Sequence, residues 1–406
     1  MTGGDYEEFY LTGLYKVPLK NNADAKYNDD AECYINGGRF GIVAGTGMEG
    51  IGSASNHTKG NIFWQIQNAD IDEFYGGGIN AASPIEGNIT TVINGGYIKQ
   101  FCGGPKFGDL YSGRTVKTTA TGCQFDNYFG AGYGGNSYST FPPKNVSGTT
   151  GDYGENNWNT FVNNNYKQEY KNETQYKGVS TEFYYQYLPV SNNTQNVERI
   201  FVNFVRFSLA TTHNVTSTLT NCTITGNFYG GGSLGKVDGP VTSRLTGCTV
   251  NGNVFGAGYS AEKPSVKVMN TGGFVKAPYY DANLGVYLEP TYPATVTYNW
   301  QQRTETVNST DLAIDKTNHI LYTNINLDKS NLGSVAGSVS LTIDGTDKKG
   351  STISGNVFGG GEQSYVTGAA NTVTVTLKGN TEVHGNVFGG GDHGVVEGST
   401  TVNIQE

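Results

Sequence analysis

Glycine runs are the residues of this chain whose spacing most resembles a chemical motif. The stretch GNVFGGGDHG, Gly385 to Gly394, places three glycines directly after a Val-Phe pair. The backbone N–H groups of such a loop can cradle phosphate, but a phosphate loop occurs once, as GxxxxGK[ST] or as a turn that opens a helix. Here the run recurs about eight times, without a Lys-Ser/Thr pair and without helical periodicity after any copy. We therefore interpret it as a repeated structural corner.

Four side chains beside the last two glycine runs are of metal-binding types. Glu362 and Asp392 follow the two runs, and His384 and His393 flank the final one. Calcium-binding Gly-rich repeats require the form GGxGxDxUx within a short repeat, whereas Glu362 and Asp392 are 30 residues apart (392 − 362). Solvated side chains are the better interpretation, and we predict no metal site and no cofactor.

Carboxylates suited to acid–base chemistry recur along the chain instead of clustering. Enzymes that cleave polysaccharides use a localised pair of carboxylates, but Glu86, Asp238 and Glu397 belong to repeated IEG, VDG and VEG turns. His57, His213 and His319 have no acidic or cysteine partner at ligand spacing, and no GxSxG nucleophile elbow is present. We predict no catalytic residues and a non-enzymatic protein.

The elements that carry these residues form an internal repeat. We take the residue before the first glycine of each run as the marker of that copy. The markers are Ala44, Tyr75, Cys102, Phe129, Tyr229, Phe255, Phe358 and Phe388. Successive markers are 31, 27, 27, 100, 26, 103 and 30 residues apart, so three groups of copies are separated by two long insertions.

The repeat predicts stacked β-strands. Segments of period-two alternation, such as VTVTL from Val373 to Leu377, predict strands, and the glycines between them predict tight corners. A unit of about 28 residues cannot bury a core alone, whereas stacked units can, with equivalent side chains in ladders. The predicted fold class is all-β: a parallel β-helix (β-solenoid) of about eight coils of about 28 residues with two lateral insertions.

Five cysteines fit this scheme without a C-x-x-C pair, so the spacing predicts neither a zinc ribbon nor a thioredoxin motif. Cys222 and Cys248 occupy the same position in successive copies, 26 residues apart. We interpret them as small apolar side chains stacked in the interior. A disulfide between them is the alternative.

The insertions set the predicted domain boundaries. We expect N-terminal coils at 1–132, a Tyr-rich insertion at 133–211, middle coils at 212–259, a second insertion at 260–331 and C-terminal coils at 332–406. Within the first insertion, ERIFVNFVRFSLA at 198–210 predicts a strand buried on both faces, or a short helix. Both insertions are too apolar for linkers, so we expect them to pack against the flank of the coils and to carry a binding surface.

Aromatic side chains provide two candidate surfaces. The first is a structural aromatic ladder formed by the markers Phe129, Tyr229, Phe255, Phe358 and Phe388. Such a column is costly to expose, so we expect loops or insertions to cover it; the alternative is a stripe that stacks on glycans or docks a partner. The second candidate is a binding surface on the insertions, comprising Tyr184, Tyr185, Tyr187, Trp158 and Trp300. Tyrosine suits both burial and recognition.

Charge and hydropathy exclude two classes of partner. The net charge is −9, from 26 basic and 35 acidic residues, which disfavours binding to nucleic-acid phosphates. No apolar run approaches the length of about 18 residues that spans a bilayer, so we predict no direct membrane insertion. The opening MTGGDYEEFY also lacks the basic and apolar regions of a signal peptide.

The unit GNVFGGG…VxG…strand resembles the large Gly-rich repeat proteins on the surface of Bacteroidetes-type bacteria and, more broadly, parallel β-helix adhesins. The repeat covers roughly half of the chain. The resemblance implies an extracellular or bacterial cell-surface location and a stalk or adhesive role. No catalytic residues carry over from it.

The sequence therefore predicts a non-enzymatic bacterial cell-surface structural or adhesion module. We expect it to be a fragment of a longer repeat protein, because solenoids need caps and TTVNIQE ends in an alternating strand. One alternative is a glycan-binding module or a polysaccharide-active enzyme that uses the Tyr-rich insertions; another is a fibre or filament subunit. The expected partners are host or microbial glycans and proteins, and neighbouring coils or copies through open solenoid ends.

Overall fold

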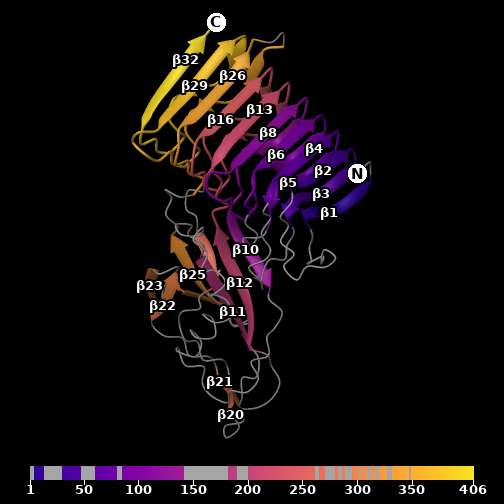
Figure 1. Ribbon diagram of the computed structural model, residues 1–406. Helices are drawn as coiled ribbons and strands as arrows, with labels where there is room; N and C mark the ends of the chain where they lie inside the picture. The colour runs from indigo at the N-terminus through magenta and orange to yellow at the C-terminus, as the bar shows by residue number, and fades with distance from the viewer. Residues whose placement is uncertain are drawn as a thin grey trace. The chain divides into compact units, whose positions relative to one another are not determined.

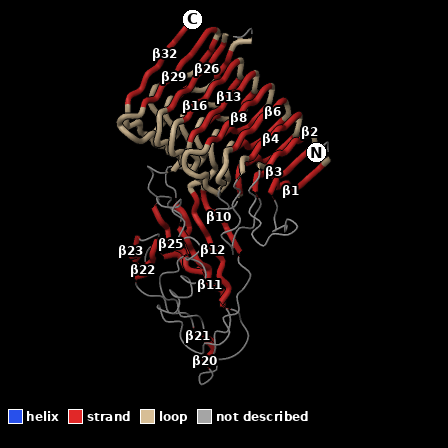
Figure 2. Tube along the Cα trace, in the orientation of Figure 1, coloured by secondary structure: helices blue, strands red, loops and turns tan. Residues whose placement is uncertain are grey.

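The computed structural model describes residues 4–11, 30–46, 60–79, 85–135, 209–260, 332–346 and 349–406 with their side chains, and residue 12 and a further set of strands by their backbone alone. No helix occurs among these described residues, and every regular element is a strand (Figure 2). The chain divides into two compact bodies. The first comprises Met1–Gly135, Ser208–Pro264 and Asp328–Glu406, and the second comprises Asn136–Phe207 and Ser265–Leu327.

The first body contains two long parallel sheets, and the chain alternates between them (Figure 1). Sheet A has nine strands: β2 (Ala31–Asn36), β4 (Ile62–Gln67), β6 (Ile89–Asn94), β8 (Thr115–Thr121), β13 (Asn214–Thr220), β16 (Val241–Thr246), β26 (Val339–Gly345), β29 (Thr372–Gly379) and β32 (Ser399–Gln405). Sheet B has thirteen: β1 (Asp5–Thr12), β3 (Arg39–Thr46), β5 (Asp70–Gly78), β7 (Tyr97–Cys102), β9 (Gln124–Phe129), β14 (Thr223–Ile224), β15 (Phe228–Tyr229), β17 (Thr249–Val250), β18 (Val254–Phe255), β27 (Ser351–Ile353), β28 (Val357–Phe358), β30 (Thr381–Val383) and β31 (Val387–Phe388). A repeat unit is one sheet A strand with the sheet B strand, or pair of short strands, that follows it.

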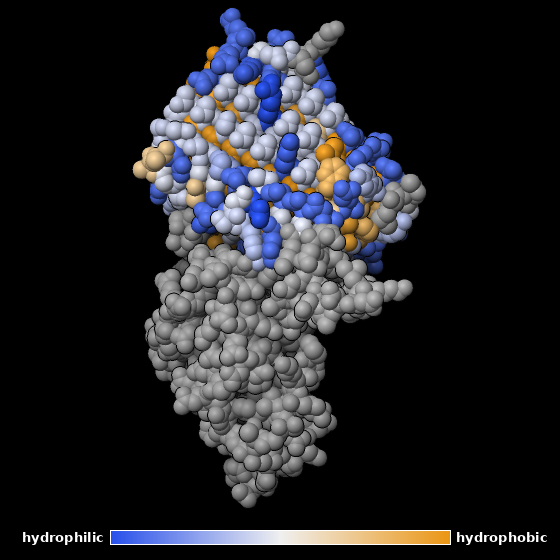
Figure 3. Space-filling model, viewed as in Figure 1, coloured by the Kyte–Doolittle hydropathy of each residue, from blue (hydrophilic) through white to orange (hydrophobic). Residues whose placement is uncertain are grey.

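Neighbouring units pair in register. Val215 pairs with Val241, Val241 with Val339, and Val339 with Val373, although 26, 98 and 34 residues separate them (241 − 215, 339 − 241 and 373 − 339). Alternate residues of each strand point inward, as the burial of every second residue in β13 illustrates. The outward residues of sheet A are mostly polar, and Figure 3 shows this face as white to pale blue with thin lines of apolar residues. The period-two patterns therefore predict these strands correctly.

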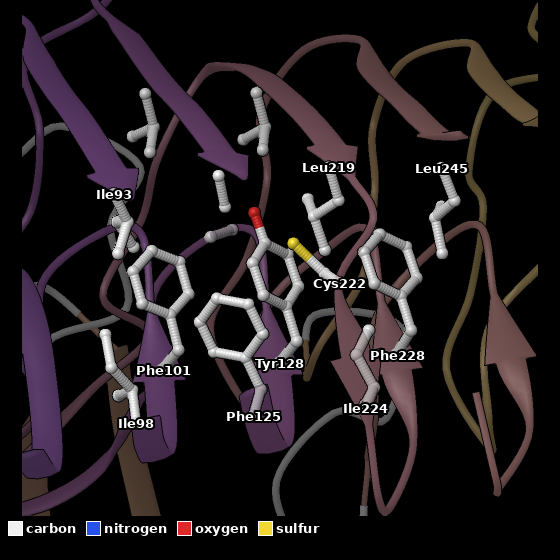
Figure 4. Packing of buried hydrophobic residues seen from close by; sticks show 14 of the residues in the cluster. Ile93, Ile98, Phe101, Phe125, Tyr128, Leu219, Cys222, Ile224, Phe228 and Leu245 are labelled. Carbon is white, nitrogen blue, oxygen red and sulfur yellow. The ribbon is translucent and has the colours of Figure 1, made fainter. Parts of the chain in front are cut away.

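Large aromatic rings fill the interior in the first half of the stack. Phe74, Phe101, Tyr128 and Phe228 lie one above another, with ring centroids 5.1, 4.8 and 4.9 Å apart. Figure 4 shows the last three of these rings in a row, with the Tyr128 hydroxyl directed toward the opposite sheet, where it donates to Ser217 Oγ at 2.8 Å. Val254 and Val357 continue the same column. The core is thus one continuous ladder that changes from aromatic to aliphatic.

The corners from sheet A to sheet B are tight. Most contain two residues, and the first of the two adopts a left-handed backbone conformation that favours Gly or Asn. These positions are Gly37 (φ 72°), Asn68 (49°), Gly95 (67°), Gly122 (65°), Asn221 (53°) and Gly247 (60°). All the long connections consequently lie on the other side of the unit, between a sheet B strand and the next sheet A strand.

At every marker except the last, Phe388, the glycine that follows it lies against the carbonyl of the next unit. A Cβ on Gly256 would be 2.3 Å from the Gly359 oxygen, and a Cβ on Gly230 would be 2.3 Å from the Gly256 oxygen. The Gly256 N–H donates to the Phe358 carbonyl at 2.9 Å. The donors that could have cradled a phosphate are therefore used between units, in agreement with their interpretation as structural corners.

The structure adds two features that the markers do not predict. β1 places Tyr10 opposite Ala44, which gives the marker column a ninth member without a glycine run. From β14 onward each sheet B strand is split in two, because three residues, 225–227, lie between Ile224 and Phe228, where two residues, 126–127, lie between Phe125 and Tyr128. The extra residue is Gly226, and a Cβ there would be 2.5 Å from the Asp126 oxygen.

The second body is also built from strands. They form two three-stranded sheets and two hairpins: β10 (Gly135–Thr140), β12 (Ile200–Ser208) and β11 (Glu182–Pro189); β19 (Ser265–Met269), β25 (Ile320–Asn326) and β24 (Leu312–Asp315); β20 (Tyr279–Asp281) and β21 (Val286–Leu288); β22 (Thr295–Trp300) and β23 (Arg303–Asn308). Within the ERIFVNFVRFSLA segment, Ile200–Ser208 form a strand and not a helix. The two parts of this body lie within the predicted insertions 133–211 and 260–331.

The close approach at the marker glycines predicts a position-specific cost of adding one methyl group. Gly256→Ala should lower the free energy of unfolding by about 1–3 kcal/mol. The neighbouring carbonyl belongs to Gly359, which directly follows the paired strand β28 and donates its own N–H to the Phe388 carbonyl, so this carbonyl cannot move away alone. Chemical denaturation followed by circular dichroism measures the change.

Gly390→Ala is the matched control, because a Cβ at Gly390 meets nothing within 4 Å. We expect it to leave stability unchanged or to raise it slightly. Equal destabilisation by both substitutions would contradict the inter-unit contact.

Candidate functional site

The marker column is a stack of parallel rings. Phe129 lies 4.9 Å from Tyr229, and Phe255 and Phe358 follow with spacings of 5.0 Å and interplanar angles of 5°. Phe388 ends the column, 5.0 Å from Phe358. Because each ring is displaced by one strand spacing, the stack follows directly from the in-register pairing of β9, β15, β18, β28 and β31.

Side chains from the following loops cover most of this column. Tyr133 packs edge-on against Phe129 and Tyr75, and Tyr259 packs against Tyr229. Four of the five ladder rings are buried, and only Phe388 is exposed, at 43%. Among the described residues the ladder is therefore a second core, and not a continuous stripe for stacking on glycans.

One polar cluster lies beside the column at its N-terminal end. The Tyr75 hydroxyl donates to Glu73 Oε2 at 2.7 Å and accepts from Gln100 Nε2 at 2.8 Å. Lys106 Nζ lies 3.0 Å from Glu73 Oε2 and 4.8 Å from the centre of the Tyr75 ring. Burial opposes ionisation of Glu73, but the hydrogen bonds from Tyr75 and Lys106 outweigh it and lower the pKa of the carboxyl. Burial and the nearby negative charge hold the pKa of Tyr75 far above its usual range, so this tyrosine is a hydrogen-bond donor and not a base.

A second tyrosine–carboxylate pair joins units that are not neighbours. The Tyr229 hydroxyl donates to Glu362 and accepts from Asn227 Nδ2. Burial, followed by the hydrogen bond to Glu362, raises the pKa of Tyr229. Glu362, one of the side chains of metal-binding type, thus has a structural partner.

Asparagine ladders are the functional-looking feature that sequence reasoning missed. Asn227 Oδ1 accepts the N–H of Asn253, Asn253 Oδ1 accepts that of Asn356, and Asn356 Oδ1 accepts that of Asn386, each at 2.8 Å. A shorter ladder of the same kind links Asp30, Asn61 and Asn88. The Asn of every GNV or GNF motif could have predicted the first ladder. Only the glycine and aromatic residues of that motif were interpreted from the sequence, and the Asn was given no role. The first ladder satisfies backbone donors between the two halves of the split sheet B strands, and the second satisfies donors just before β4 and β6 of sheet A.

The five cysteines are free and buried. Cys123, Cys222 and Cys248 lie in one column at the start of the sheet B segments, as expected for stacked small side chains, and Figure 4 shows the sulfur of Cys222 beside the Tyr128 ring. Burial raises the pKa of the Cys33 thiol to about 11 and that of Cys102 well above its ordinary value. The raised pKa values make the Cys33 and Cys102 thiols poor nucleophiles in the folded chain.

The remaining acidic and histidine candidates have separate local partners. Glu397 accepts the Gly368 N–H at 2.6 Å, and Asp238 lies 3.8 Å from Lys236 Nζ. Asp392 lies 2.7 Å from His393 Nδ1. In the described part of the chain, no three His, Cys, Asp or Glu side chains are grouped as metal ligands.

The predicted binding residues of the insertions fall outside the described side chains. The backbone places Tyr184, Tyr185 and Tyr187 on β11, paired with β12, and Trp300 at the end of β22. Trp158 lies outside the described residues. Their role as a binding surface stays a prediction.

No protein-family model matches this chain, and no curated protein or solved structure is significantly similar to it. Within the described residues, no helix is long and apolar enough to cross a bilayer.

The ladder predicts unequal effects of removing rings at its middle and its end. Phe255→Ala should cost about 3–5 kcal/mol of unfolding free energy, because the ring is fully buried between two others. Phe388→Ala should cost less than about half of that, because 43% of the residue is already exposed. Denaturant midpoints of the two variants, measured side by side, decide this; equal costs would mean that the column is not stacked as described.

The Glu73 cluster predicts a pH-dependent contribution to stability. A carboxyl whose pKa is lower in the folded chain stabilises it above the unfolded pKa of about 4.3, and the contribution disappears as pH falls through the folded pKa. Glu73→Gln should therefore destabilise the chain by about 0.5–1 kcal/mol at neutral pH, a modest value because the side chain is 38% exposed.

The difference between the Glu73→Gln variant and the wild type should close in acid, as thermal unfolding at several pH values would record. Glu7→Gln, at an exposed position of β1, is the control and should show no difference at any pH. A constant deficit of Glu73→Gln across the pH range would refute the electrostatic origin.

Proposed function

We propose that the protein is a non-enzymatic structural and adhesion module of a bacterial cell surface, built as a parallel β-helix. The observation that carries the proposal is the position of the long connections, which all lie between a sheet B strand and the next sheet A strand of an otherwise uniform stack. A stack of this kind is a rigid support with one variable edge.

The winding of the chain supports the β-helix. Each unit passes from sheet A through a tight corner to sheet B and then returns to sheet A. On the return, short parallel bridges join neighbouring units: Ile85 to Leu110, Thr212 to Val237, Val237 to Val335, Val335 to Val366, and Val366 to Val396. Three aligned segments per unit, all parallel to their counterparts, are what a chain that coils in one sense produces.

The chemistry of the described residues supports a structural role. The repeated glycine, asparagine and aromatic residues form their hydrogen bonds and apolar contacts with neighbouring units of the stack. The carboxylates Glu73, Glu362 and Glu397 each bind a different local partner. Polysaccharide cleavage needs two carboxylates, one on each side of the bond that is cleaved. Because these three carboxylates each have a separate partner within a repeated framework, we favour a structural role over a catalytic one.

The variable edge supports an adhesive role. The two longest connections, which follow β9 and β18, supply the second body. Solenoids commonly carry their binding surfaces on insertions of this kind. Host or microbial glycans and proteins are the partners that we propose. The resemblance of the repeat to Gly-rich surface proteins supports a location at the bacterial cell surface. A net charge of −9 disfavours nucleic acid as a partner, which is compatible with that location.

The test is a binding array of glycans and extracellular-matrix proteins, probed with two forms of the chain. One is the whole chain; in the other, 136–207 and 265–327 are replaced by copies of the short connection found at 230–240, between β15 and β16. We expect ligands for the whole chain that the trimmed form does not bind, while both show the same β circular dichroism.

Retention of all binding by the trimmed form would move the site to the stack and contradict the proposal. Release of reducing ends from any bound polysaccharide, assayed on the same preparations, would instead make the protein an enzyme.

A further inference from the structure

Three of the buried cysteines are consecutive members of one column. Cys123, Cys222 and Cys248 each lie directly before a sheet B strand. The Thr223 N–H donates to the Cys123 carbonyl, and the Thr249 N–H donates to the Cys222 carbonyl, each at 2.9 Å. These are ladder bonds between adjacent strands, so Cys222 lies between the other two cysteines, about 4.8 Å from each along the stack. Packing as small side chains makes no use of the chemistry of the three thiols.

The three thiols are oriented alike. Each sulfur lies close to the carbonyl oxygen of the residue two positions before its own cysteine, at 3.3 Å for Cys123 and 3.4 Å for both Cys222 and Cys248. Hydrogen bonding by the Cys123 thiol, followed by that of the Cys248 thiol, lowers the pKa of Cys222. Cys222 is therefore the thiol of the three that ionises most readily, and the thiolate is the nucleophile of disulfide exchange.

The spacing permits a covalent bond between neighbours in this column. A disulfide joins cysteines whose Cα atoms are about 4.4–6.8 Å apart, and paired parallel strands hold equivalent Cα atoms about 4.8 Å apart. Both side chains project from the same side of the sheet, so rotation about their Cα–Cβ bonds is the main movement that brings the sulfurs together. Cys222 has two such neighbours and can form a bond with only one of them.

Two observations favour Cys123 over Cys248 as the partner of Cys222. The Cys123 thiol has the larger effect on the pKa of Cys222. Cys123 is also 3% exposed, whereas Cys222 and Cys248 are completely buried. A Cβ on Gly122 would meet nothing within 4 Å, so the corner that carries Cys123 borders open space and gives a reagent a way to the column.

We propose that Cys123 and Cys222 form a disulfide when the protein meets an oxidising low-molecular-weight disulfide. The chain leaves the first body after Gly135 and returns to it at Ser208. The bond therefore closes a loop of 99 residues (222 − 123) that contains the whole first insertion, and it makes the pairing of β9 with β14 covalent. The site does not depend on the adhesive function. Its use rests on that function, because a ligand held by the insertion pulls on the two chain segments that this bond joins.

The reaction is a thiol–disulfide exchange in two steps. The Cys222 thiolate attacks the reagent R–S–S–R, which breaks the S–S bond, forms a mixed disulfide and releases one R–S⁻. The Cys123 thiol loses its proton to water and attacks the sulfur of Cys222, which forms the protein disulfide and releases the second R–S⁻. Both cysteines are oxidised, the reagent is reduced, and the two protons lost by the cysteines convert the two R–S⁻ into R–SH. Because the sulfurs are buried, exchange requires the corner to open, so we expect it to be fast during refolding and slow in the folded chain.

Refolding the unaltered chain with oxidised or with reduced glutathione tests the proposal, with thiols then counted in denaturant. We expect three free thiols after oxidation (5 − 2) and five after refolding with reduced glutathione. A non-reducing digest of the oxidised chain should contain the Cys123 peptide linked to the Cys222 peptide, identified by mass spectrometry. Five free thiols under both conditions would overturn the proposal, and so would a link between Cys222 and Cys248 in place of the expected one.

Serine substitutions within the column provide matched variants, because Ser351 occupies the equivalent position in the unit after Cys248. Oxidation should raise the thermal unfolding midpoint of the wild type and of Cys248→Ser by about 5 °C, since the bond restricts a long loop of the unfolded chain. Cys123→Ser should show no such rise. Circular dichroism of the reduced proteins checks that all three fold alike. An equal rise in Cys123→Ser, or no rise in Cys248→Ser, would contradict the assignment of the pair.

Discussion

In-register parallel pairing is the constraint on which this structure depends. Each residue lies about 4.8 Å from its counterpart in the next unit, so every column of the stack must tolerate its own repetition. Aromatic rings, asparagine amides and small side chains repeat favourably, and they form the ladders through Phe255, Asn253 and Cys222. Charged side chains repel when repeated, which gives a physical reason for a charged content of only 15%.

The same constraint separates the invariant from the variable parts of the chain. A two-residue corner with a left-handed first residue, as at Gly95 or Asn221, fixes most of the steps from sheet A to sheet B, and the longest step, 346–350, has only five residues. The return from sheet B to sheet A has no such requirement, and segments of very different length lie there. Support and recognition can therefore change independently, which suits the proposed adhesive module.

Most of the first body can be predicted from the sequence, because residues at equivalent positions of successive repeats are neighbours in the folded stack. The marker residues give the stacked column, and the alternation of VTVTL gives an inward and an outward face. Prediction from the sequence fails for β1, because this strand is not followed by a glycine run. It also fails for the ladder asparagines, because each lies next to a glycine that dominates the repeat pattern. The partners of Tyr75 and Tyr229 also escape it, because Lys106 and Glu362 reach them from loops whose paths depend on the folded stack.

The most direct test of the account is a set of distances along one outward column of sheet A, from spin labels introduced in pairs. Thr119, Thr218, Arg244, Thr342, Thr376 and Asn403 occupy successive strands. From Thr119, the label–label distance should be about 19 Å to Thr376 and about 24 Å to Asn403, one strand spacing of about 4.8 Å per unit whatever the length of chain between them. Distances that grow with sequence separation, or that spread broadly, would contradict in-register stacking.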